Sequence, residues 1–220
     1  MTETPDTRTV ILDIAEAMLR DRGFPAFSYQ DIADRVGIRK ASVYYHFPSK
    51  EGLGMALVER FEARLKALGQ GIADATPVEK FELYFRSTRA VLEERDKICA
   101  FGILSAEINA LPPEMRVLVS RMMTKELRWL ERVLEEGRTR GHFEDNATIE
   151  EQASVVSASL QGALQVARAT QDPERFHAVE RLLKAQILTP EGRAALVEIP
   201  ACPPCLEALH THFPKPATNP

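Results

Sequence analysis

Residues 28–47 read Ser-Tyr-Gln-Asp-Ile-Ala-Asp-Arg-Val-Gly-Ile-Arg-Lys-Ala-Ser-Val-Tyr-Tyr-His-Phe, which is the pattern of two short helices joined at a glycine. Ser28 and Asp31 have the spacing of a capping box, in which the hydroxyl accepts a hydrogen bond from a backbone amide and the carboxylate reaches back. Gly37 can adopt a positive φ without steric cost, so it ends the first short helix. The stretch therefore predicts a helix-turn-helix.

The apolar residues of this stretch are spaced so that both short helices can pack against a preceding helix, predicted over residues 8–22. They are Ile32, Ala33, Val36, Ile38, Val43 and Phe47. The remaining side chains of the second helix then point outward, and most are hydrogen-bond donors. Residues 35–50 contain four Lys or Arg and no Asp or Glu, although the formal net charge of the chain is −4. This local excess of positive charge indicates a surface that faces phosphates.

A recognition helix enters the major groove by its N-terminal part, so we expect Arg39 and Lys40 to reach base edges. Phosphates on either side are expected to contact Ser28, Tyr29, Tyr44, His46 and Lys50. The pattern alone leaves one alternative open. Any two amphipathic helices joined by a glycine look similar, and Arg39 and Lys40 are then simply solvated.

Apolar residues recur at helical spacing along the rest of the chain, and no segment shows the alternation typical of a strand. The prediction is an all-α fold in three parts. These are an N-terminal three-helix helix-turn-helix DNA-binding domain at residues 1–52, a helical dimerisation domain at 53–189, and a Pro-rich C-terminal tail at 190–220. Further helices are predicted after Pro48 and over residues 78–95, 102–109, 113–138, 149–169 and 173–188.

The composition excludes several classes of protein. With 45% hydrophobic and 27% charged residues the chain is typical of a globular protein, and three cysteines are too few for a disulfide scaffold. The N-terminus lacks the apolar region of a signal peptide, and no segment is long and apolar enough to span a membrane, so we expect a cytoplasmic protein. A Gly-rich phosphate loop, a nucleophile elbow and an HExxH motif are all missing, so we predict neither an enzyme nor a cofactor.

The run Val43-Tyr-Tyr-His-Phe-Pro-Ser-Lys-Glu-Gly-Leu53, preceded by Ile32-Ala33 and Val36-Gly37-Ile38, resembles the signature of TetR-family transcriptional regulators. The resemblance covers about residues 8–55, and the helical remainder is similar in length to the variable ligand-binding domain of that family. It implies phosphate contacts from Tyr44, His46 and Lys50. It also implies that Arg39, Lys40 and Ser42 face the groove and that Tyr45 packs inward.

The family resemblance further implies that a small-molecule effector binds between the helices of residues 55–188 and changes the separation of two DNA-reading heads. Candidate ligand-binding side chains are aromatic, sulfur-containing or charged: Phe85, Arg89, Cys99, Phe101, Glu107, Met122 and Trp129. Aromatic and thioether groups pair apolar bulk with adaptability, and a buried charge requires a partner. For each apolar member of this set the helical spacing favours a plain core, and for Arg89 the sequence favours the surface.

Two groups of residues raise the alternative of a thiol or metal sensor. Residues 99–107 resemble a TetR subgroup that includes repressors responsive to electrophiles and reactive small acids. Cys99 precedes a short predicted helix and follows Lys97, and both neighbours favour the thiolate, although lone cysteines are usually small buried hydrophobes. The tail contains Cys202, Cys205, His210 and His212, but the intervening prolines and the HxH spacing do not favour a metal site, so we predict no metal.

Residues 154–164 are rich in small residues that let two helices approach closely, either in a homodimer or against the helix at 113–138 of the same chain. The resemblance to TetR proteins favours the homodimer. A second stripe is expected from Phe176, Val179, Leu182, Leu183 and Ile187. The favoured function is a dimeric repressor that a small-molecule effector releases from a palindromic double-stranded DNA operator. The alternatives are the thiol or metal sensor on the same scaffold and a helical adaptor that does not bind DNA.

Overall fold

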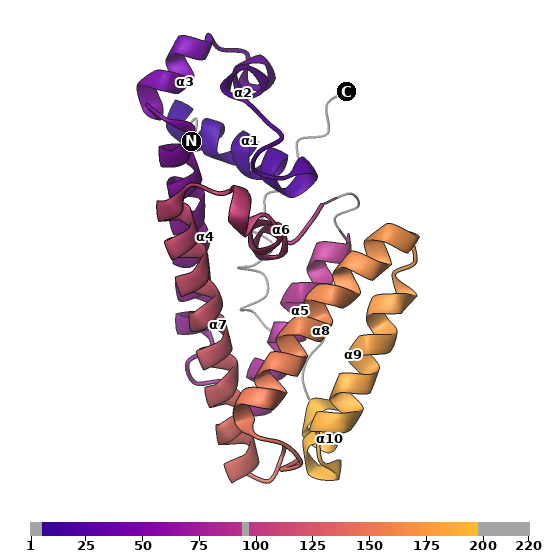
Figure 1. The fold of residues 1–220 in the computed structure, drawn as a ribbon. Coiled ribbons are helices and arrows are strands. Elements are labelled where there is room, and N and C mark those ends of the chain that lie inside the picture. Colours follow the sequence, from indigo (N-terminus) through magenta and orange to yellow (C-terminus); the bar gives the residue numbers. More distant parts are fainter. Residues whose placement is uncertain (1–5, 94–96, 198–220) are drawn as a thin grey trace, which may run out of the picture. The chain divides into compact units, whose positions relative to one another are not determined.

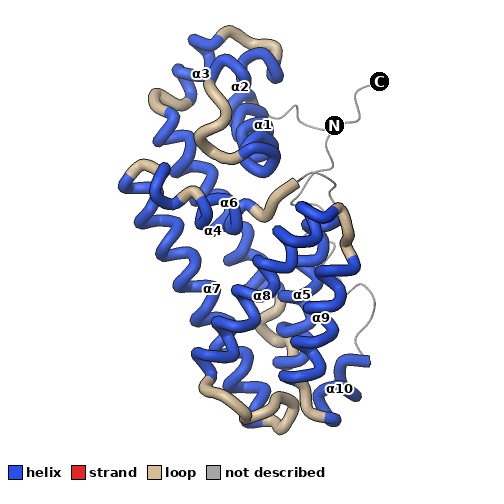
Figure 2. Tube along the Cα trace, turned by 45° about the vertical axis from the view of Figure 1, so that its right-hand side comes forward, coloured by secondary structure: helices blue, strands red, loops and turns tan. Residues whose placement is uncertain are grey.

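The computed structural model of the protein describes residues 6–93 and 97–197. These residues form ten α-helices, one 3-10 turn and no strand, which confirms the all-α prediction (Figures 1 and 2). The first helices are α1 (Thr7–Arg22), α2 (Tyr29–Val36), α3 (Lys40–His46), α4 (Lys50–Gly71) and α5 (Pro77–Glu93). They are followed by α6 (Ala100–Ala106), the 3-10 turn η1 (Ile108–Ala110), α7 (Pro113–Thr139), α8 (Ile149–Thr170), α9 (Glu174–Ile187) and α10 (Pro190–Val197).

The described residues divide into two compact units. The first unit contains residues 6–62 and 97–125, and the second contains residues 63–93 and 126–197. Both α4 and α7 continue from one unit into the other. The first unit therefore holds more of the chain than residues 1–52, to which the sequence assigns the DNA-binding domain.

The first unit is larger because α6 and the beginning of α7 share the core of the helix-turn-helix. Leu104 of α6 and Met115 of α7 are buried in the same cluster as Ile11 and Ile32. Gly54 of α4 allows close packing there, since a Cβ atom at this position would lie 2.3 Å from the Met115 sulfur. Sequence periodicity assigns α6 and α7 apolar faces but does not say which helices those faces meet.

The local signals that predict the helix-turn-helix are confirmed. Ser28 and Asp31 form the capping box, with the Ser28 backbone amide donating to the Asp31 carboxylate at 2.7 Å. The Ser28 hydroxyl and amide hold the pKa of Asp31 below its usual value, so the capping carboxylate stays charged at neutral pH. Gly37 ends α2 in the left-handed region, with φ of 77°.

In the second unit α8 lies beside α9 over most of its length (Figures 1 and 2). A capping box of Thr148 and Glu151 begins α8. The first eight residues of the predicted Pro-rich tail form α10. The Thr189 hydroxyl accepts a hydrogen bond from the Gly192 amide. Glycine is required at position 192 because a Cβ atom there would lie 2.1 Å from the His142 carbonyl oxygen.

Cys202, Cys205, His210 and His212 lie outside the described residues. Within residues 6–93 and 97–197 there is no group of three His, Cys, Asp or Glu side chains that could hold a metal ion. The described helices also include none with both the length and the apolar character needed to cross a membrane.

Candidate nucleic-acid interface

The second helix of the helix-turn-helix, α3, presents its basic N-terminal end to solvent. Arg39 caps α3 without a side-chain hydrogen bond and Lys40 is its first residue, and both side chains are exposed. The opposite side of the helix is held by Val43 and Phe47, which are 0% and 3% exposed. Because the apolar side is buried in the core, the two cations must face outward.

Aromatic rings extend this basic surface along α3. Tyr44 is 48% exposed, and the Lys40 ammonium lies 6.0 Å from its ring centroid. Ser42 and His46, two further predicted contacts, are half-buried. The outer face of α3 thus brings together cations, a hydroxyl and an aromatic ring, which are the groups that contact phosphates and base edges.

Tyr29 has a different position from the one expected of a phosphate contact. It is 5% exposed, and its hydroxyl donates to the Phe47 carbonyl oxygen at 2.8 Å. Burial, with a smaller contribution from Tyr44, raises the pKa of Tyr29 to about 12, so the phenol remains a donor at neutral pH. In this structure Tyr29 ties the start of α2 to the end of α3.

Tyr29→Phe is therefore expected to lower the free energy of unfolding by about 1 kcal/mol, since the Phe47 carbonyl loses its buried donor. Urea denaturation followed by circular dichroism measures the change. Tyr45→Phe, which removes the same hydroxyl from an exposed position, is the matched control and should leave the midpoint unchanged. Equal stability of the two variants would contradict the assigned role.

The inward packing of Tyr45 implied by the family resemblance is wrong for this chain, because Tyr45 is 84% exposed. Successive helical residues are 100° apart, so Tyr45 lies about 200° from both Val43 and Phe47, which are buried. The outer face of α3 therefore has a second exposed tyrosine that the sequence analysis assigned to the core.

Lys50 lies over the loop between α1 and α2. Its ammonium is 4.8 Å and 4.7 Å from the ring centroids of Phe24 and Phe27, and it donates to the Pro25 carbonyl oxygen at 3.4 Å. Burial lowers the pKa of Lys50, while the Glu107 carboxylate acts in the opposite direction. The predicted phosphate contact of Lys50 thus requires the ammonium to leave these partners. The exposed Ser28 also has a partner within the protein, because its hydroxyl donates to the Asp31 carboxylate at 2.6 Å. Its predicted phosphate contact therefore competes with this hydrogen bond.

Four of the seven predicted ligand-binding residues belong to the first unit. Glu107 accepts a hydrogen bond from the Phe24 amide at 2.9 Å, so its carboxylate holds the loop between α1 and α2. Met122 is 3% exposed and Phe101 packs against the same core. Cys99 is half-buried at the N-cap of the seven-residue α6, and the Lys97 ammonium donates to the Ala17 carbonyl oxygen at 3.4 Å.

The other three predicted ligand-binding residues belong to the second unit. Phe85 is fully buried, and Trp129 is half-buried with its ring centroid 5.9 Å from that of Tyr84. Arg89, for which the sequence favours exposure, is a charge-paired side chain with 32% exposure that donates to Glu180 at 3.2 Å. The seven candidates therefore do not all lie within one compact unit.

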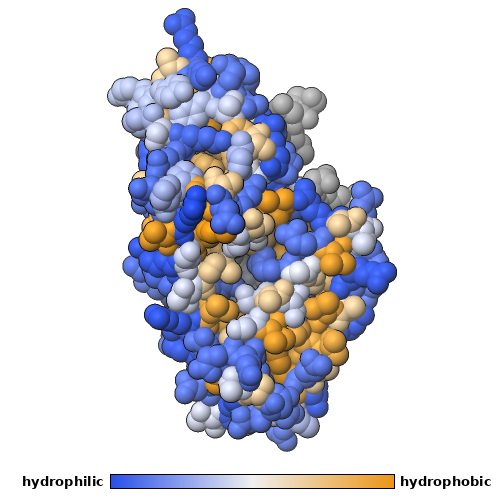
Figure 3. All heavy atoms as spheres, in the orientation of Figure 1, coloured by the Kyte–Doolittle hydropathy of each residue, from blue (hydrophilic) through white to orange (hydrophobic). Residues whose placement is uncertain are grey.

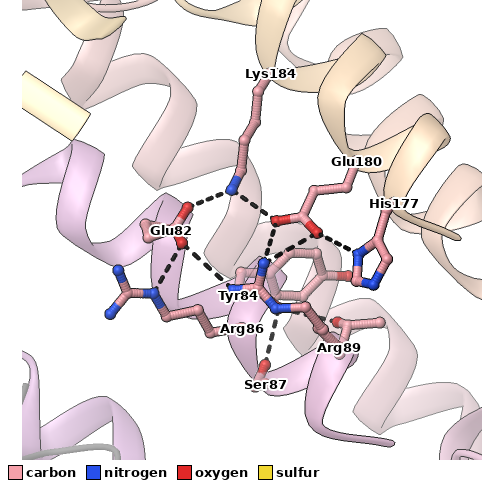
Figure 4. A network of polar contacts seen from close by, with 9 residues as sticks. Glu82, Tyr84, Arg86, Ser87, Arg89, His177, Glu180 and Lys184 are labelled. Carbon is pink, nitrogen blue, oxygen red and sulfur yellow. Dashed lines mark hydrogen bonds and ion pairs between the residues drawn. The ribbon is translucent and has the colours of Figure 1, made fainter. Parts of the chain in front are cut away.

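Arg89 is part of a charged network that joins α5 to α9 (Figure 4). Two carboxylates, Glu82 and Glu180, are 5% and 4% exposed. Lys184 contacts both of them, at 2.5 Å and 2.7 Å, and lies 5.0 Å from the Phe85 ring centroid. Arg86 donates to Glu82 at 2.8 Å, so each buried carboxylate has at least two cationic partners.

Glu126, a polar group of the second unit, is not among the residues that the sequence motifs single out. Glu126 of α7 accepts hydrogen bonds from the Tyr84 hydroxyl of α5 and, at 3.4 Å, from the Ser157 hydroxyl of α8. A signal for it exists in the sequence. The buried residues of α7 at positions 115, 119, 122, 130 and 133 follow helical spacing, and position 126 falls on the same stripe. A carboxylate on a core stripe indicates a specialised site.

Two helices joined at a left-handed glycine, with a basic outer face on the second one, define a helix-turn-helix DNA-binding protein. Residues 11–57 match the family model described as bacterial regulatory proteins, tetR family, and residues 77–183 match the tetracyclin repressor-like C-terminal domain. The chain belongs to the TetR family of transcriptional regulators, which combine a DNA-binding helix-turn-helix with a ligand-binding domain.

Relatives and solved structures agree with this assignment. The transcriptional repressor KstR2 of Mycobacterium tuberculosis is 29% identical over 145 residues, which are 65% of this chain and 72% of that protein. A TetR regulator from Legionella pneumophila has a TM-score of 0.76 and 28% identity, covering 84% of this chain and 100% of its own. The reduced form of NemR from Escherichia coli has a TM-score of 0.72 and 26% identity, covering 84% and 99%.

Proposed function

We propose that this protein is a dimeric transcriptional repressor that occupies a palindromic DNA operator and leaves it when a small-molecule effector binds its second unit. The observation that carries the proposal is the outer face of α3, where Arg39, Lys40 and Tyr44 are exposed above a fully packed core. The repressor KstR2 among its relatives supports repression as the mode of action.

The dimer interface in this proposal is formed by α8 and α9. Val155 and Val166 of α8 are 52% and 50% exposed, with the small Ser159 and Gly162 between them at helical spacing. On α9 Leu182 is 57% exposed, and Figure 3 shows apolar surface along both helices. A face of this kind, with small residues flanked by aliphatic ones, suits the close packing of a two-fold helical interface.

The dimer stripe expected on α9 needs one correction. Phe176, Leu183 and Ile187 are no more than 4% exposed and pack within their own chain. Leu182 is the member of that stripe with a large exposed surface. The interface thus uses the other side of α9, because three of the predicted residues are already part of the core.

Duplexes from the region flanking the coding sequence test the DNA-binding part of the proposal. Fluorescence anisotropy should show tight binding to one palindromic segment, and the logarithm of the association constant should fall linearly with the logarithm of the salt concentration. Random duplex of the same length should bind more weakly. A folded protein with no salt-dependent affinity for any duplex would mean that the proposed function is wrong.

Leu182→Glu is expected to convert the dimer into a monomer and to weaken operator binding, because it places two like charges in a two-fold apolar interface. Light scattering after size exclusion gives the mass. The matched control is Val117→Glu, at a 68% exposed apolar residue outside α8 and α9, and it should remain dimeric. A Leu182→Glu variant with dimer mass would exclude this interface.

A further inference from the structure

The two carboxylate oxygens of Glu126 differ in the hydrogen bonds that they accept from the described residues. The Tyr84 hydroxyl and the Ser157 hydroxyl both donate to Oε1. The other oxygen, Oε2, receives no hydrogen bond from any residue that the structure describes. Glu126, Tyr84 and Trp129 are half-buried, so each of them keeps some surface in contact with solvent.

Among the residues that the structure describes, Glu126 differs from the buried carboxylates Glu82 and Glu180 of its unit in having no cationic partner. Glu82 and Glu180 are each paired with at least two cationic side chains (Figure 4). Across the described residues no Lys, Arg or His forms an ion pair with Glu126. Burial raises the pKa of Glu126 against the two hydroxyl hydrogen bonds, which lower it. A positive charge placed at Oε2 would stabilise the ionised carboxylate and so offset the free-energy penalty of burying it.

Aromatic rings lie next to the same carboxylate. Trp129 follows Glu126 by three residues on α7, so both side chains occupy one face of the helix. The Tyr84 and Trp129 ring centroids are 5.9 Å apart. A carboxylate near tyrosine and tryptophan rings attracts an ammonium group by charge, and a ring face that the ligand reaches adds a cation–π interaction.

We propose that Glu126, Tyr84 and Trp129 recognise an organic cation, an amine or a quaternary ammonium compound, and that this cation is the effector of the regulator. The inference rests on the proposed function, because it names the chemical class of the molecule that releases the DNA. Ser157 holds the carboxylate in place from α8 and leaves Oε2 to the ligand.

Matched pairs of probes test the inference. Choline and 2-phenylethylamine are the cations, and 3,3-dimethylbutan-1-ol and 2-phenylethanol are neutral molecules of closely similar shape. A ligand that prefers the native state raises the Tm, so at least one cation should raise it while its neutral partner does not. If neither cation shifts the Tm, or if each neutral partner acts equally, the inference is overturned.

Variants assign the binding to this carboxylate. Glu126→Gln keeps the shape and removes the charge, and should weaken the cation by roughly 10- to 100-fold in a calorimetric titration. Glu135→Gln, which neutralises an exposed carboxylate of the same helix, is the control and should bind like the unmodified protein. Equal affinity of the two variants would place the cation elsewhere and overturn the inference.

The pH dependence of unfolding separates recognition from a structural role. A carboxyl whose folded pKa is raised contributes stability below its ordinary pKa of 4.5 and loses it as the pH rises through the raised value. Without ligand, Glu126→Gln should therefore gain Tm relative to the unmodified protein as the pH rises above the ordinary pKa of 4.5. A variant that loses Tm over this range would show a satisfied structural carboxylate instead.

The DNA-binding assay separates the two proposals. If the protein binds its operator and no cation releases it, this inference fails while the proposed function stands. If no duplex binds at all, the proposed function fails, and the Tm measurements still decide whether Glu126 binds cations.

Discussion

Replacing Arg39 and Lys40 together by alanine is expected to lower operator affinity by roughly 10²- to 10⁴-fold, at about 1–3 kcal/mol for each side chain. Both residues stand at the N-terminal end of α3, the part of a recognition helix that enters the major groove. Both are exposed, so the Tm should not change. Anisotropy titrations against operator and random duplex measure the loss.

The matched control for this pair is Lys66→Ala with Arg132→Ala, which removes one Lys and one Arg from exposed positions in the second unit. The net charge changes equally in both double variants. The control should keep its affinity and salt dependence if the effect of Arg39 and Lys40 is local. An equal loss of operator affinity in both double variants would show that Arg39 and Lys40 act only through the net charge of the protein.

The largest effect on stability is expected from Glu82→Ala, which should lower the free energy of unfolding by about 3 kcal/mol, the lower end of the range for breaking a buried ion pair. Glu82 lies at the centre of the network between α5 and α9, and its removal leaves Lys184 and Arg86, each about 15% exposed, without this partner. Arg89 is a third exposed, so solvent screens its share.

Glu174→Ala is the control for this change, because Glu174 pairs with Arg181 on α9 while both side chains are more than 60% exposed. Surface pairs contribute about 0–1 kcal/mol, so the urea midpoint should barely move. A Glu82→Ala variant as stable as Glu174→Ala would show that the network does not hold α5 to α9. A double-mutant cycle, which compares the Glu82→Ala and Lys184→Ala variants with the double variant, measures the interaction energy between these two side chains.

The helix-turn-helix could be predicted almost completely from the sequence, because its signals act over a few residues. The spacing from Ser28 to Asp31 makes a capping box wherever the backbone enters a helix, and Gly37 accepts a left-handed conformation at no cost. The burial of Ile32 and Val43 follows from helical periodicity. Arg39 and Lys40 are left outside for the same reason.

Periodicity assigns a side chain to a face, but it does not identify the partner of that face. The sequence predicts a phosphate contact for Tyr29, yet its hydroxyl donates to the Phe47 carbonyl oxygen, 18 residues away. Lys50 lies on the rings of Phe24 and Phe27 because the loop between α1 and α2 folds back beneath it. These positions depend on packing between segments whose spacing along the chain has no fixed rule.

The sequence by itself determined an all-helical regulator with a DNA-reading head, since hydrophobic period, capping residues and local charge are properties of neighbouring residues. Only the tertiary structure decided which side chains are free to act. Glu126 becomes a candidate recognition group because folding brings it to Tyr84, 42 residues before it, and to Ser157, 31 residues after it, while no described residue pairs it with a cation. The physical reason is that the energy of a buried charge depends on all groups around it, and those come from distant parts of the chain.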